Sequence, residues 1–421
     1  MPPTDHPPVI VIGAGAAGML AAGTAAEAGA RVLLLEKMKR PGIKLAITGK
    51  GRCNLTNNAA INQFLERFGP NGRFLRQALQ AFDNHALINF FNDLGLATKS
   101  ERGGRVFPAS DSAPEVVRAL CNWLEKLGVR LECNCPVSRL ITSGSRITAV
   151  ASGPHRYPAG AVILTTGGAS YPATGSTGDG WQLLRPLGHT LIPPRPALVP
   201  LVSSSPLPHH PAGLNLRNVK VRLKIDGKKR REEFGELTFT PDGVGGPTIL
   251  TLSEAAASAS RAGREVVIVI DLKPALDETR LDRRLQRDLT KRSRENLASI
   301  LRGLMPRELV PTALALNRLD PERKGTQVTA AERRRLKTWL KDFRIPIAGA
   351  RPLSEALVTA GGVALKEVDP RTLASRKIAN LFLAGEILDL AADTGGYNLQ
   401  AAFSTGRLAG RTAALPQTGK I

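Results

Sequence analysis

The chain has 421 residues, of which 42% are hydrophobic and 22% charged, so we expect a globular protein of two or three domains. Its 58 Lys and Arg against 36 Asp and Glu give a net charge of +22, which favours a polyanionic partner such as RNA, with a solubilising surface charge as the alternative. The absence of an apolar run of ~20 residues, of a secretory pattern and of a disulfide framework excludes the membrane and secreted classes and predicts a cytoplasmic protein.

The chain opens with a dinucleotide-binding pattern. A β-branched run, Val9–Ile12, predicts a buried parallel strand, and an alanine-rich stretch predicts a helix to about Ala28. A second strand is expected over Arg31–Leu35 and is followed by Glu36. A glycine-rich turn between strand and helix, with an acid closing the next strand, is the context that supports a dinucleotide fingerprint. Its glycines are Gly13, Gly15 and Gly18.

Each part of this fingerprint has a physical role. The first glycine permits a tight turn, the second lets the backbone approach a pyrophosphate, and the third lets the helix pack on the strand. The helix N-terminus, at Ala16 and Ala17, offers N–H groups and partial positive charge to phosphates. The carboxylate of Glu36 can accept hydrogen bonds from a ribose, so the fingerprint predicts FAD or NAD.

A loop rich in glycine and cations, Thr48–Asn54, follows the second strand. We expect Lys44, Lys50 and Arg52 to neutralise a pyrophosphate. Alternatively, Arg52 lies near the flavin. Cys53 lies among these cations, which lower the pKa of a thiol. We therefore consider it a proton donor, the alternative being a small buried packing residue.

A further strand is predicted at Val162–Thr166, ending in a Gly-Gly turn at Gly167. The polar stretch beyond it, which includes Tyr171, is a candidate for hydrogen bonds to a substrate. Its other polar residues are Thr174, Ser176, Thr177 and Asp179. Cys133 and Cys135 form a C-x-C pair on a predicted strand without a second ligand pair, so no metal site is expected.

The C-terminal segment predicts a second half of the same site. A strand at Asn380–Leu383 ends at Gly385–Glu386, and Gly395–Gly396 opens a helix near Tyr397. This helix would direct its positive end at the flavin pyrimidine ring, and Asp389 is placed to bind ribityl or pyrophosphate groups. Two helix N-termini from opposite chain ends favour FAD over NAD. Since no second GxGxxG and no CxxC is present, NAD(P)H is expected to dock only transiently as reductant.

The middle of the chain differs in composition. A proline-rich connector begins at about Pro193, and alternating residues over 216–272 predict a small antiparallel sheet or barrel. Residues 275–344 are helical in pattern, and Thr329 and Glu332 form a predicted capping box. From Arg280 to Arg344 there are 18 Lys and Arg and 8 Asp and Glu, a net charge of +10.

This helical insert is the candidate RNA-binding surface. Six cations crowd two turns with few acidic partners four residues away, which favours a polyanion, although a solvated helix face is the alternative. They are Arg283, Arg284, Arg287, Lys291, Arg292 and Arg294. A second basic patch on a predicted hairpin tip contains Lys228, Lys229, Arg230 and Arg231.

Several motifs together resemble one family. They are TGKGRCN at Thr48–Asn54, ERGGRVFP at Glu101–Pro108, GGASYPATGSTGDG at Gly167–Gly180, and the Val358–Gly410 segment with VTAGGVAL, NLFLAGEILD and DTGGYNLQAAFSTGRLAG. In this order they resemble the BaiN-like (YhiN-type) family of bacterial FAD-dependent flavoproteins over nearly the whole chain. The resemblance implies links to dihydrouridine synthesis in ribosomal RNA and, for other members, to steroid-like substrates. A proline replaces the family's usual histidine within Phe239–Pro247, which weakens transfer of the mechanism.

The expected fold is therefore α/β: a glutathione-reductase-type FAD-binding Rossmann domain with an inserted small β-domain and a basic helical insert. The expected ranges are 1–194 with 346–421 for the FAD-binding domain, 195–274 for the β-domain, and 275–345 for the helical insert. The candidate catalytic residues are Cys53 and Tyr397, with Tyr171 also open as proton donor. The predicted FAD contacts are Gly13, Gly15, Ala16, Ala17, Gly18, Glu36, Lys37, Lys44, Thr48, Gly49, Gly51, Arg52, Asn54, Val137, Thr166, Gly167, Gly385, Glu386, Asp389, Gly395, Gly396 and Asn398.

The leading hypothesis is reduction of a uridine in large-subunit (23S) ribosomal RNA, with hydride delivered from flavin N5 to C6 of the base and a proton to C5. One alternative is a flavin-dependent reductase or oxidase of a free enone or steroid-like molecule. The other is a non-enzymatic RNA-binding factor that retains FAD. We expect ribosomal RNA or its precursor as partner, no membrane, no stable protein partner, and a monomer or homodimer.

Overall fold

The computed structural model describes residues 7–415, and the chain divides into two compact units. Unit 2 is the insertion Pro196–Pro352, and unit 1 joins the residues on either side of it. The insertion ends at Pro352 rather than at 345 because its last strand continues to Ala350. The outer ends of the expected FAD-binding domain, 1–6 and 416–421, lie outside the described residues.

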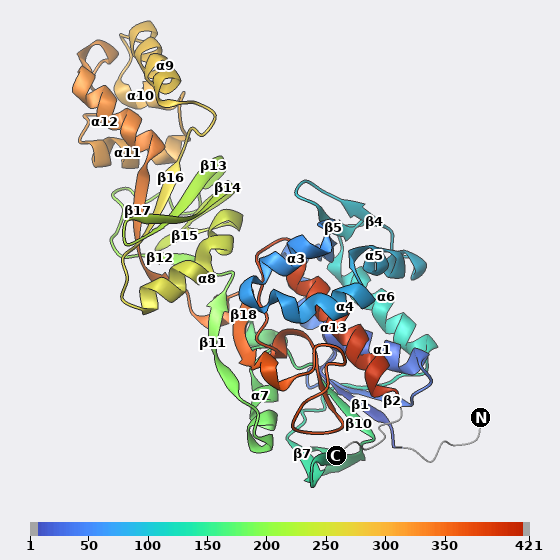
Figure 1. Cartoon of the computed structure of the whole chain (residues 1–421). Helices are drawn as coiled ribbons and strands as arrows, with labels where there is room; N and C mark the ends of the chain where they lie inside the picture. The colour runs from blue at the N-terminus through green and yellow to red at the C-terminus, as the bar shows by residue number, and fades with distance from the viewer. Residues whose placement is uncertain (1–6, 416–421) are drawn as a thin grey trace. The chain divides into compact units, whose positions relative to one another are not determined.

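Unit 1 is built on a five-stranded parallel sheet (Figure 1). Its central strand consists of four buried β-branched residues, as expected for a strand with neighbours on both edges and helices on its faces. Val9 lies opposite Ala161 on one side and Val32 on the other. The strands in spatial order are β19 (Leu381–Leu383), β10 (Ala161–Leu164), β1 (Val9–Ile12), β2 (Val32–Leu35) and β6 (Arg130–Glu132).

The helix of the fingerprint and the C-terminal helix lie side by side in this unit (Figure 1). They are α1 (Ala16–Glu27) and α13 (Tyr397–Ala413). A Cβ at Gly406 would lie 2.2 Å from the carbonyl oxygen of Ala17, and one at Gly410 would lie 2.3 Å from that of Ala21. These two glycines, one turn apart, let the backbones approach and bring the C-terminal segment to the dinucleotide turn.

The remaining elements of unit 1 surround this sheet. Its other helices are α2 (Ile43–Ile47), α3 (Ile61–Arg67), α4 (Arg76–Ala81), α5 (Asn84–Asp93), α6 (Ala113–Lys126) and α7 (Asp179–Leu184). Its small sheets contain β3 (Thr56–Asn57), β5 (Arg105–Pro108) and β4 (Thr98–Ser100); β7 (Arg139–Ser143), β8 (Arg146–Ser152) and β9 (His155–Pro158); and the pair β11 (Leu191–Ala197) and β18 (Val358–Val363). The prediction that Cys133 and Cys135 lie on a strand is wrong, because β6 ends at Glu132 and the chain bends there.

Unit 2 contains a closed barrel of six strands, as the barrel alternative predicted, although residues 247–261 of the alternating segment form a helix instead of a strand. The strand order is β12 (Leu201–Ser203), β15 (Gly243–Gly245), β14 (Lys228–Thr240), β13 (Asn215–Ile225), β16 (Val266–Asp271) and β17 (Phe343–Ala350). Helix α8 (Pro247–Arg261) packs on the barrel and contributes buried residues such as Ile249 and Leu252 to its core.

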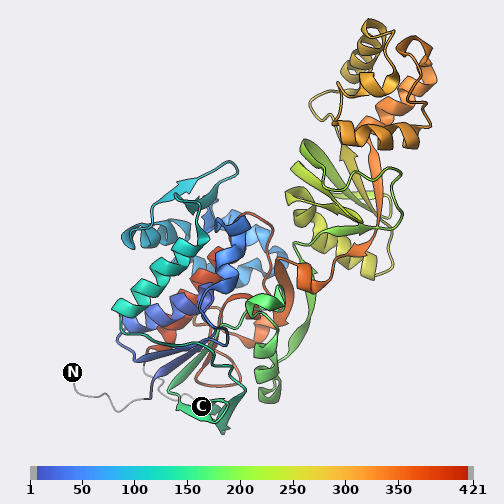
Figure 2. The same cartoon turned by 180° about the vertical axis from the view of Figure 1, so that it is seen from behind.

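A group of helices lies between β16 and β17, at the end of the barrel (Figures 1 and 2). They are α9 (Glu278–Lys291), α10 (Leu297–Leu301), α11 (Val310–Asn317) and α12 (Ala330–Lys341). The capping box at the start of α12 is confirmed: Glu332 N–H donates to Thr329 Oγ1 at 3.2 Å, and Thr329 N–H donates to Glu332 Oε2 at 2.9 Å. Barrel and helices share one hydrophobic core, so their separation into two domains stays a prediction.

Candidate functional site: a dinucleotide cradle and a basic insertion

The three fingerprint glycines have different surroundings. Gly13 has a φ of +99°, and a Cβ there would lie 2.7 Å from the carbonyl oxygen of Thr165. A Cβ at Gly18 would lie 1.8 Å from the carbonyl oxygen of Gly13, whereas one at Gly15 would meet no atom within 4 Å. The first and third glycines are therefore required by packing, and the second faces open space. This is the arrangement that backbone contact with a pyrophosphate requires.

Glu36 joins the fingerprint turn to the end of β2. Its Oε2 accepts from Ala14 N–H at 2.7 Å, and its Oε1 accepts from Met38 N–H at 2.8 Å. Each carboxylate oxygen keeps further acceptor capacity for a ribose hydroxyl. Because Gly15 is the N-cap of α1 and has no side-chain acceptor, the N–H groups at the helix start remain open to an anion.

An ion pair joins the two ends of the chain. Lys44 Nζ lies 2.7 Å from Glu386 Oε2 and 2.8 Å from Ser170 Oγ, although the lysine and the glutamate are separated by 342 residues. The other carboxylate oxygen of Glu386 accepts from Thr359 N–H at 2.7 Å. The predicted convergence of the regions around 44 and 386 is thus present in unit 1.

A second junction lies at the start of α13. Asn57 Nδ2 donates to the carbonyl oxygen of Gly395 at 3.0 Å. With its amide oriented to satisfy both groups, Asn54 accepts from Gly396 N–H at 3.0 Å. Gly396 has a φ of +95°, and a Cβ there would lie 2.4 Å from the carbonyl oxygen of Thr56. Glycine is needed at this N-cap, which leaves a second helix N-terminus without a side-chain cap.

Of the cations predicted to contact a pyrophosphate, Lys44 and Arg52 have carboxylate partners within unit 1, as does the predicted FAD contact Lys37, whereas the exposed Lys50 makes no ion pair among residues 7–415. Lys37 Nζ lies 2.7 Å from Asp179 Oδ2 and donates to Thr177 Oγ1. The Arg52 guanidinium pairs with Glu101 and Asp111 and lies over the Phe107 ring, 4.2 Å from its centroid. These pairs order the loops around the turn at Gly13–Gly18, the Lys44–Glu386 junction and the start of α13 at Gly396, which together we call the cradle. Contact of the same cations with a pyrophosphate stays a prediction.

The expectation of a lowered pKa at Cys53 is wrong for this fold. The thiol is completely buried, and burial raises its pKa to about 12, although the Thr48 side chain partly opposes the shift. The cations of the loop do not offset the effect of burial on this pKa, and the guanidinium of Arg52 is engaged by Glu101 and Asp111. The thiol is therefore protonated at neutral pH, and the packing alternative describes its environment.

The two candidate tyrosines differ in exposure. Tyr397 is 6% exposed, with the Phe64 ring edge-on at 4.8 Å between centroids and the Arg67 guanidinium 5.6 Å from its ring centroid. Tyr171 is half-buried and has a φ of +53°, a left-handed conformation that costs energy for a side chain of this size. A strained backbone at a polar loop is a feature of functional sites, so Tyr171 remains a candidate.

The other predicted FAD contacts also lie in unit 1, where they make different hydrogen bonds or form turns. Asp389 Oδ1 accepts from Gly361 N–H at 2.9 Å, and its Oδ2 lies 3.2 Å from Asn71 Nδ2. Asn398 holds the loop before α13 through two bonds to the backbone of Ala392, at 2.9 and 3.0 Å. Thr166 has a buried hydroxyl with no partner among residues 7–415. The remaining positions, Thr48, Gly49, Gly51, Val137, Gly167 and Gly385, line turns or strand ends of this unit.

Sequence reasoning missed several residues that build the cradle. Thr165 Oγ1 donates to the carbonyl oxygens of Ile12 and Gly13, both at 2.9 Å, and so holds the fingerprint turn. Ser170 and Thr359 complete the surroundings of Glu386, and Asn57 holds Gly395. Thr165 directly precedes the predicted FAD contact Thr166 at the end of a strand, and this position could have identified it as a site residue. No local sequence pattern identified Thr359, because its partner Glu386 lies 27 residues away.

These features fit FAD. Open space beside Gly15, two helix N-termini without side-chain caps, and the orphaned hydroxyl of Thr166 are all available to a ligand with a pyrophosphate and an anionic ring system. The residues that would hold it come from both ends of unit 1.

The basic helix α9 has two distinct faces. Leu281, Leu285 and Leu289 are buried, whereas Arg283, Arg287 and Lys291 are exposed and recur every four residues. We call these three residues the α9 ridge. Of the six predicted cations, Arg284 pairs with an acid four residues away, Asp288. Arg287 also pairs with Asp288, and Arg292 pairs with Glu295 three residues on, so nearby acids neutralise more of these cations than the spacing of four residues indicated. Arg283, Lys291 and Arg294 make no ion pair among residues 7–415.

The second predicted patch is partly neutralised. Lys228, Lys229, Arg230 and Arg231 begin β14 directly after the turn at Asp226 and Gly227. Lys229 pairs with Glu232 at 2.8 Å, and Arg231 pairs with Glu233 at 3.0 Å. This hairpin is therefore a weaker candidate for a polyanion than the α9 ridge.

Within the described part of the chain, no helix is long and apolar enough to cross a bilayer, and no group of three His, Cys, Asp or Glu side chains is arranged to hold a metal ion.

Comparisons with known proteins cover almost the whole chain. A bile-acid reductase of Clostridium scindens, named 3-dehydro-bile acid delta(4,6)-reductase, is 35% identical over 96% of this chain and 98% of its own. A ribosomal RNA dihydrouridine synthase of Escherichia coli is 29% identical over 94% of this chain and 95% of its own. The crystal structure of 3-ketosteroid-delta4-(5alpha)-dehydrogenase from Rhodococcus jostii has a TM-score of 0.53 at 18% identity, covering 98% of each chain, and indicates the shared fold.

The family model for the HI0933-like protein Rossmann domain matches residues 7–412. This match spans both halves of the cradle and the insertion between them. The protein therefore belongs to the HI0933-like family, whose members are Rossmann-type, FAD-dependent oxidoreductases, as the BaiN-like resemblance of its motifs implied.

Proposed function

We propose that this protein reduces a uridine of large-subunit ribosomal RNA to dihydrouridine in an FAD-dependent reaction. The observation that carries the proposal is the α9 ridge: exposed cations on the face opposite the buried leucines, of which Arg283 and Lys291 make no ion pair among the described residues. Such cations gain little within the fold and gain most by neutralising phosphates. The similarity to the Escherichia coli dihydrouridine synthase supports the same substrate.

The chemistry of the base suits a flavin site. The C5=C6 bond of uracil is conjugated with the C4 carbonyl, so C6 is electron-poor and accepts a hydride, which reduced FAD supplies when bound. The protein's own residues would bind and orient the cofactor through the open side of Gly15, the N-terminus of α13 and the Lys44–Glu386 junction. C5 must then receive a proton. Cys53, Tyr171 and Tyr397 stay open as its source, and Tyr171 has both the exposure and the strained backbone of a functional residue.

A second candidate is supported by the 35% identity to the bile-acid reductase. The name of that relative denotes reduction of a conjugated unsaturated ketone, and the reducible bond of uracil has the same conjugation with a carbonyl. The cradle can therefore serve either substrate, and the choice depends on what the insertion binds. A free steroid would not require the exposed cations of unit 2.

The test is mass-spectrometric quantification of dihydrouridine in 23S ribosomal RNA from a deletion strain. We expect one site to lose the modification and to regain it with the wild-type gene, but not with Gly15→Ala or Arg283→Glu/Lys291→Glu. Unchanged dihydrouridine at every site would contradict the proposal. Reduction of a 3-oxo-4,6-diene steroid by the purified protein without RNA, at a rate unaffected by Arg283→Glu/Lys291→Glu, would establish the second candidate. Restoration of cell function by a variant that cannot bind flavin would indicate a non-enzymatic RNA-binding factor.

A further inference from the structure

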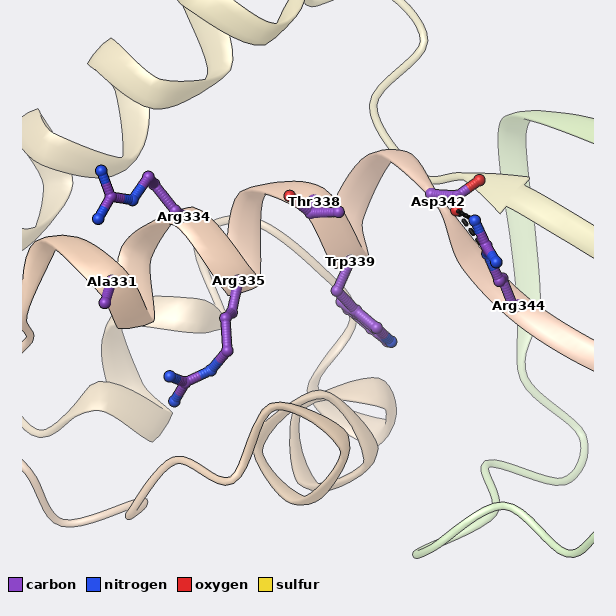
Figure 3. A pocket seen from close by; sticks show the side chains of 7 residues that line it. All are labelled: Ala331, Arg334, Arg335, Thr338, Trp339, Asp342 and Arg344. Carbon is purple, nitrogen blue, oxygen red and sulfur yellow. Dashed lines mark hydrogen bonds and ion pairs between the residues drawn. The ribbon is translucent and has the colours of Figure 1, made fainter.

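A groove with a volume of about 550 Å³ lies on α12, apart from the α9 ridge (Figure 3). The surface is open and shallow rather than enclosed, which suits a strand lying along it more than a small molecule held inside it. Figure 3 shows Arg335 and Trp339 projecting to the same side of α12, with the Asp342–Arg344 pair beyond the end of the helix. The full lining is Ala331, Arg334, Arg335, Thr338, Trp339, Asp342 and Arg344. We call this surface the α12 groove.

The α12 groove faces away from α9. Arg333 and Lys337, on another face of α12, pair with Asp282 at 3.2 Å and Glu278 at 3.7 Å and so hold the two helices together. Leu336 and Leu340 are buried in the core. The groove residues lie on the remaining face of the helix, so this surface is separate from the basic face that the sequence of α9 indicated.

The charge of the groove is positive. Arg334 and Arg335 are exposed, and Arg334 has no ion pair among residues 7–415. Arg335 donates to the carbonyl oxygen of Asn317 at 3.2 Å, which uses one of its five N–H groups and fixes the guanidinium. The single acid of the lining, Asp342, is already paired with Arg344 at 2.6 Å and with Arg222 at 3.5 Å. Figure 3 shows the Arg334 guanidinium on the opposite side of α12 from that of Arg335, so two anions carried by one strand would each meet one available guanidinium group.

The groove also offers an aromatic surface. Trp339 is half-buried, and its ring lies against Phe343 with 4.7 Å between centroids and 37° between planes. This contact holds the indole in place while its exposed part lines the groove. In proteins that bind single-stranded RNA, unstacked bases stack on fixed aromatic rings, and neighbouring arginines contact the phosphates.

From these observations we propose that the α12 groove binds a single-stranded segment of RNA, with phosphates at Arg334 and Arg335 and one base stacked on Trp339. The choice of RNA among polyanions rests on the proposed function. The site itself rests on the groove, its charge and its indole. The strand in the groove would be an unpaired segment of the same RNA that carries the modified nucleotide.

The test uses fluorescence anisotropy of a labelled single-stranded oligouridylate of about ten nucleotides, a length within the usual range for such surfaces. Arg334→Glu/Arg335→Glu is expected to weaken binding at least about tenfold and to flatten the dependence of affinity on salt, because two phosphate contacts are lost. The matched control is Arg217→Glu/Arg302→Glu, which makes the same change of charge at exposed arginines of unit 2 that have no ion pair in the described part of the chain. Equal loss in both variants would overturn the proposal.

The base contact has its own measurement. The wild-type protein is expected to bind the oligouridylate about tenfold more tightly than an abasic strand of the same length. Trp339→Leu, which keeps an apolar side chain against Phe343, should abolish that difference, with circular dichroism confirming the fold. Quenching of Trp339 fluorescence by the probe should accompany binding, since the other two tryptophans are buried. Equal binding of both strands by the wild type would overturn stacking on Trp339.

These results separate the groove from the proposed function. Binding through the α12 groove in a protein whose deletion leaves all dihydrouridine intact would overturn the proposed function and support the groove. Loss of dihydrouridine in the deletion strain, combined with full binding by Arg334→Glu/Arg335→Glu, would support the function and overturn the groove.

Discussion

Three cations of the cradle and three cations of the insertion differ in what they contact. In unit 1, Lys37, Lys44 and Arg52 each have a carboxylate partner, and these partners lie far away in the sequence. In unit 2, Arg283, Lys291 and Arg334 have none among residues 7–415. Unit 2 has 30 Lys and Arg against 18 Asp and Glu, a net charge of +12 in less than half of the chain.

The paired cations stabilise the fold, whereas the unpaired cations are available to a binding partner. A largely buried pair such as Lys44–Glu386 joins two loops, and removal of one partner leaves the other as an unpaired, desolvated charge. Exposed, unpaired cations repel one another within the fold and are stabilised by phosphates. The number of cations in a segment therefore does not reveal their role, whereas their partners do.

The largest effect is expected in the backbone packing of the cradle. Gly18→Ala places a Cβ 1.8 Å from the carbonyl oxygen of Gly13, and overpacking of this kind costs about 3 kcal/mol. We expect this loss in the free energy of unfolding from urea denaturation, together with loss of bound flavin. The matched variant Gly15→Ala meets no atom within 4 Å. It should unfold as the wild type does and still bind FAD at least about tenfold more weakly, since its methyl group occupies space needed by the pyrophosphate.

The next effect concerns the unpaired cations of unit 2. Arg283→Glu/Lys291→Glu should weaken binding of 23S ribosomal RNA fragments by about tenfold or more, and should reduce the slope of log affinity against log salt by roughly 2. Filter binding at several salt concentrations measures both. The free energy of unfolding should stay within about 0.5 kcal/mol of the wild-type value. A large loss of stability would mean that the α9 ridge supports the fold, as the cradle cations do.

A smaller effect is expected for the ion pair of the cradle. In a double-mutant cycle of Lys44→Met and Glu386→Gln, the coupling energy should be about 1 kcal/mol, because both side chains are three-quarters buried. Arg307–Glu308 serves as control, since these side chains are 83% and 48% exposed. Its coupling should be close to zero. Similar coupling energies for the two pairs would contradict the conclusion that the cradle pair stabilises the fold more than an exposed pair of the insertion does.

The smallest effect at neutral pH concerns Cys53. Burial raises the pKa of its thiol to about 12, from an ordinary value of 9.0, so the folded protein retains a proton that the unfolded chain loses first. The resulting stabilisation is complete below about pH 9 and is lost as the pH rises towards 12. Alkylation by iodoacetamide, mapped by mass spectrometry, should spare Cys53 at pH 7 to 9 and modify the half-buried Cys121 and Cys133 first. Early modification of Cys53 would revive its role as a reactive thiol.

Local patterns predicted much of unit 1 correctly. The strand, turn and helix around Gly13–Gly18, the strand after them and the C-terminal helix were all expected, since their signals lie within a few adjacent residues. The barrel and the capping box of α12 were predictable for the same reason. The environment of Cys53 was not, because burial depends on residues packed from elsewhere in the chain. The partner of Arg284 could have been predicted from its spacing of four residues to Asp288.

The sequence by itself determined the parallel sheet, the dinucleotide turn, the barrel and the excess of positive charge, because periodicity, glycine positions and composition are properties of short segments. Only the tertiary structure decided which cations are paired, that Gly15 faces open space while Gly18 does not, and that Arg334, Arg335 and Trp339 share one groove. The pairing of Lys44 with Glu386 depends on a distance between segments 342 residues apart, and the groove depends on which face of α12 the buried core leaves exposed. Such distances are set by the packing of the core and not by any local pattern.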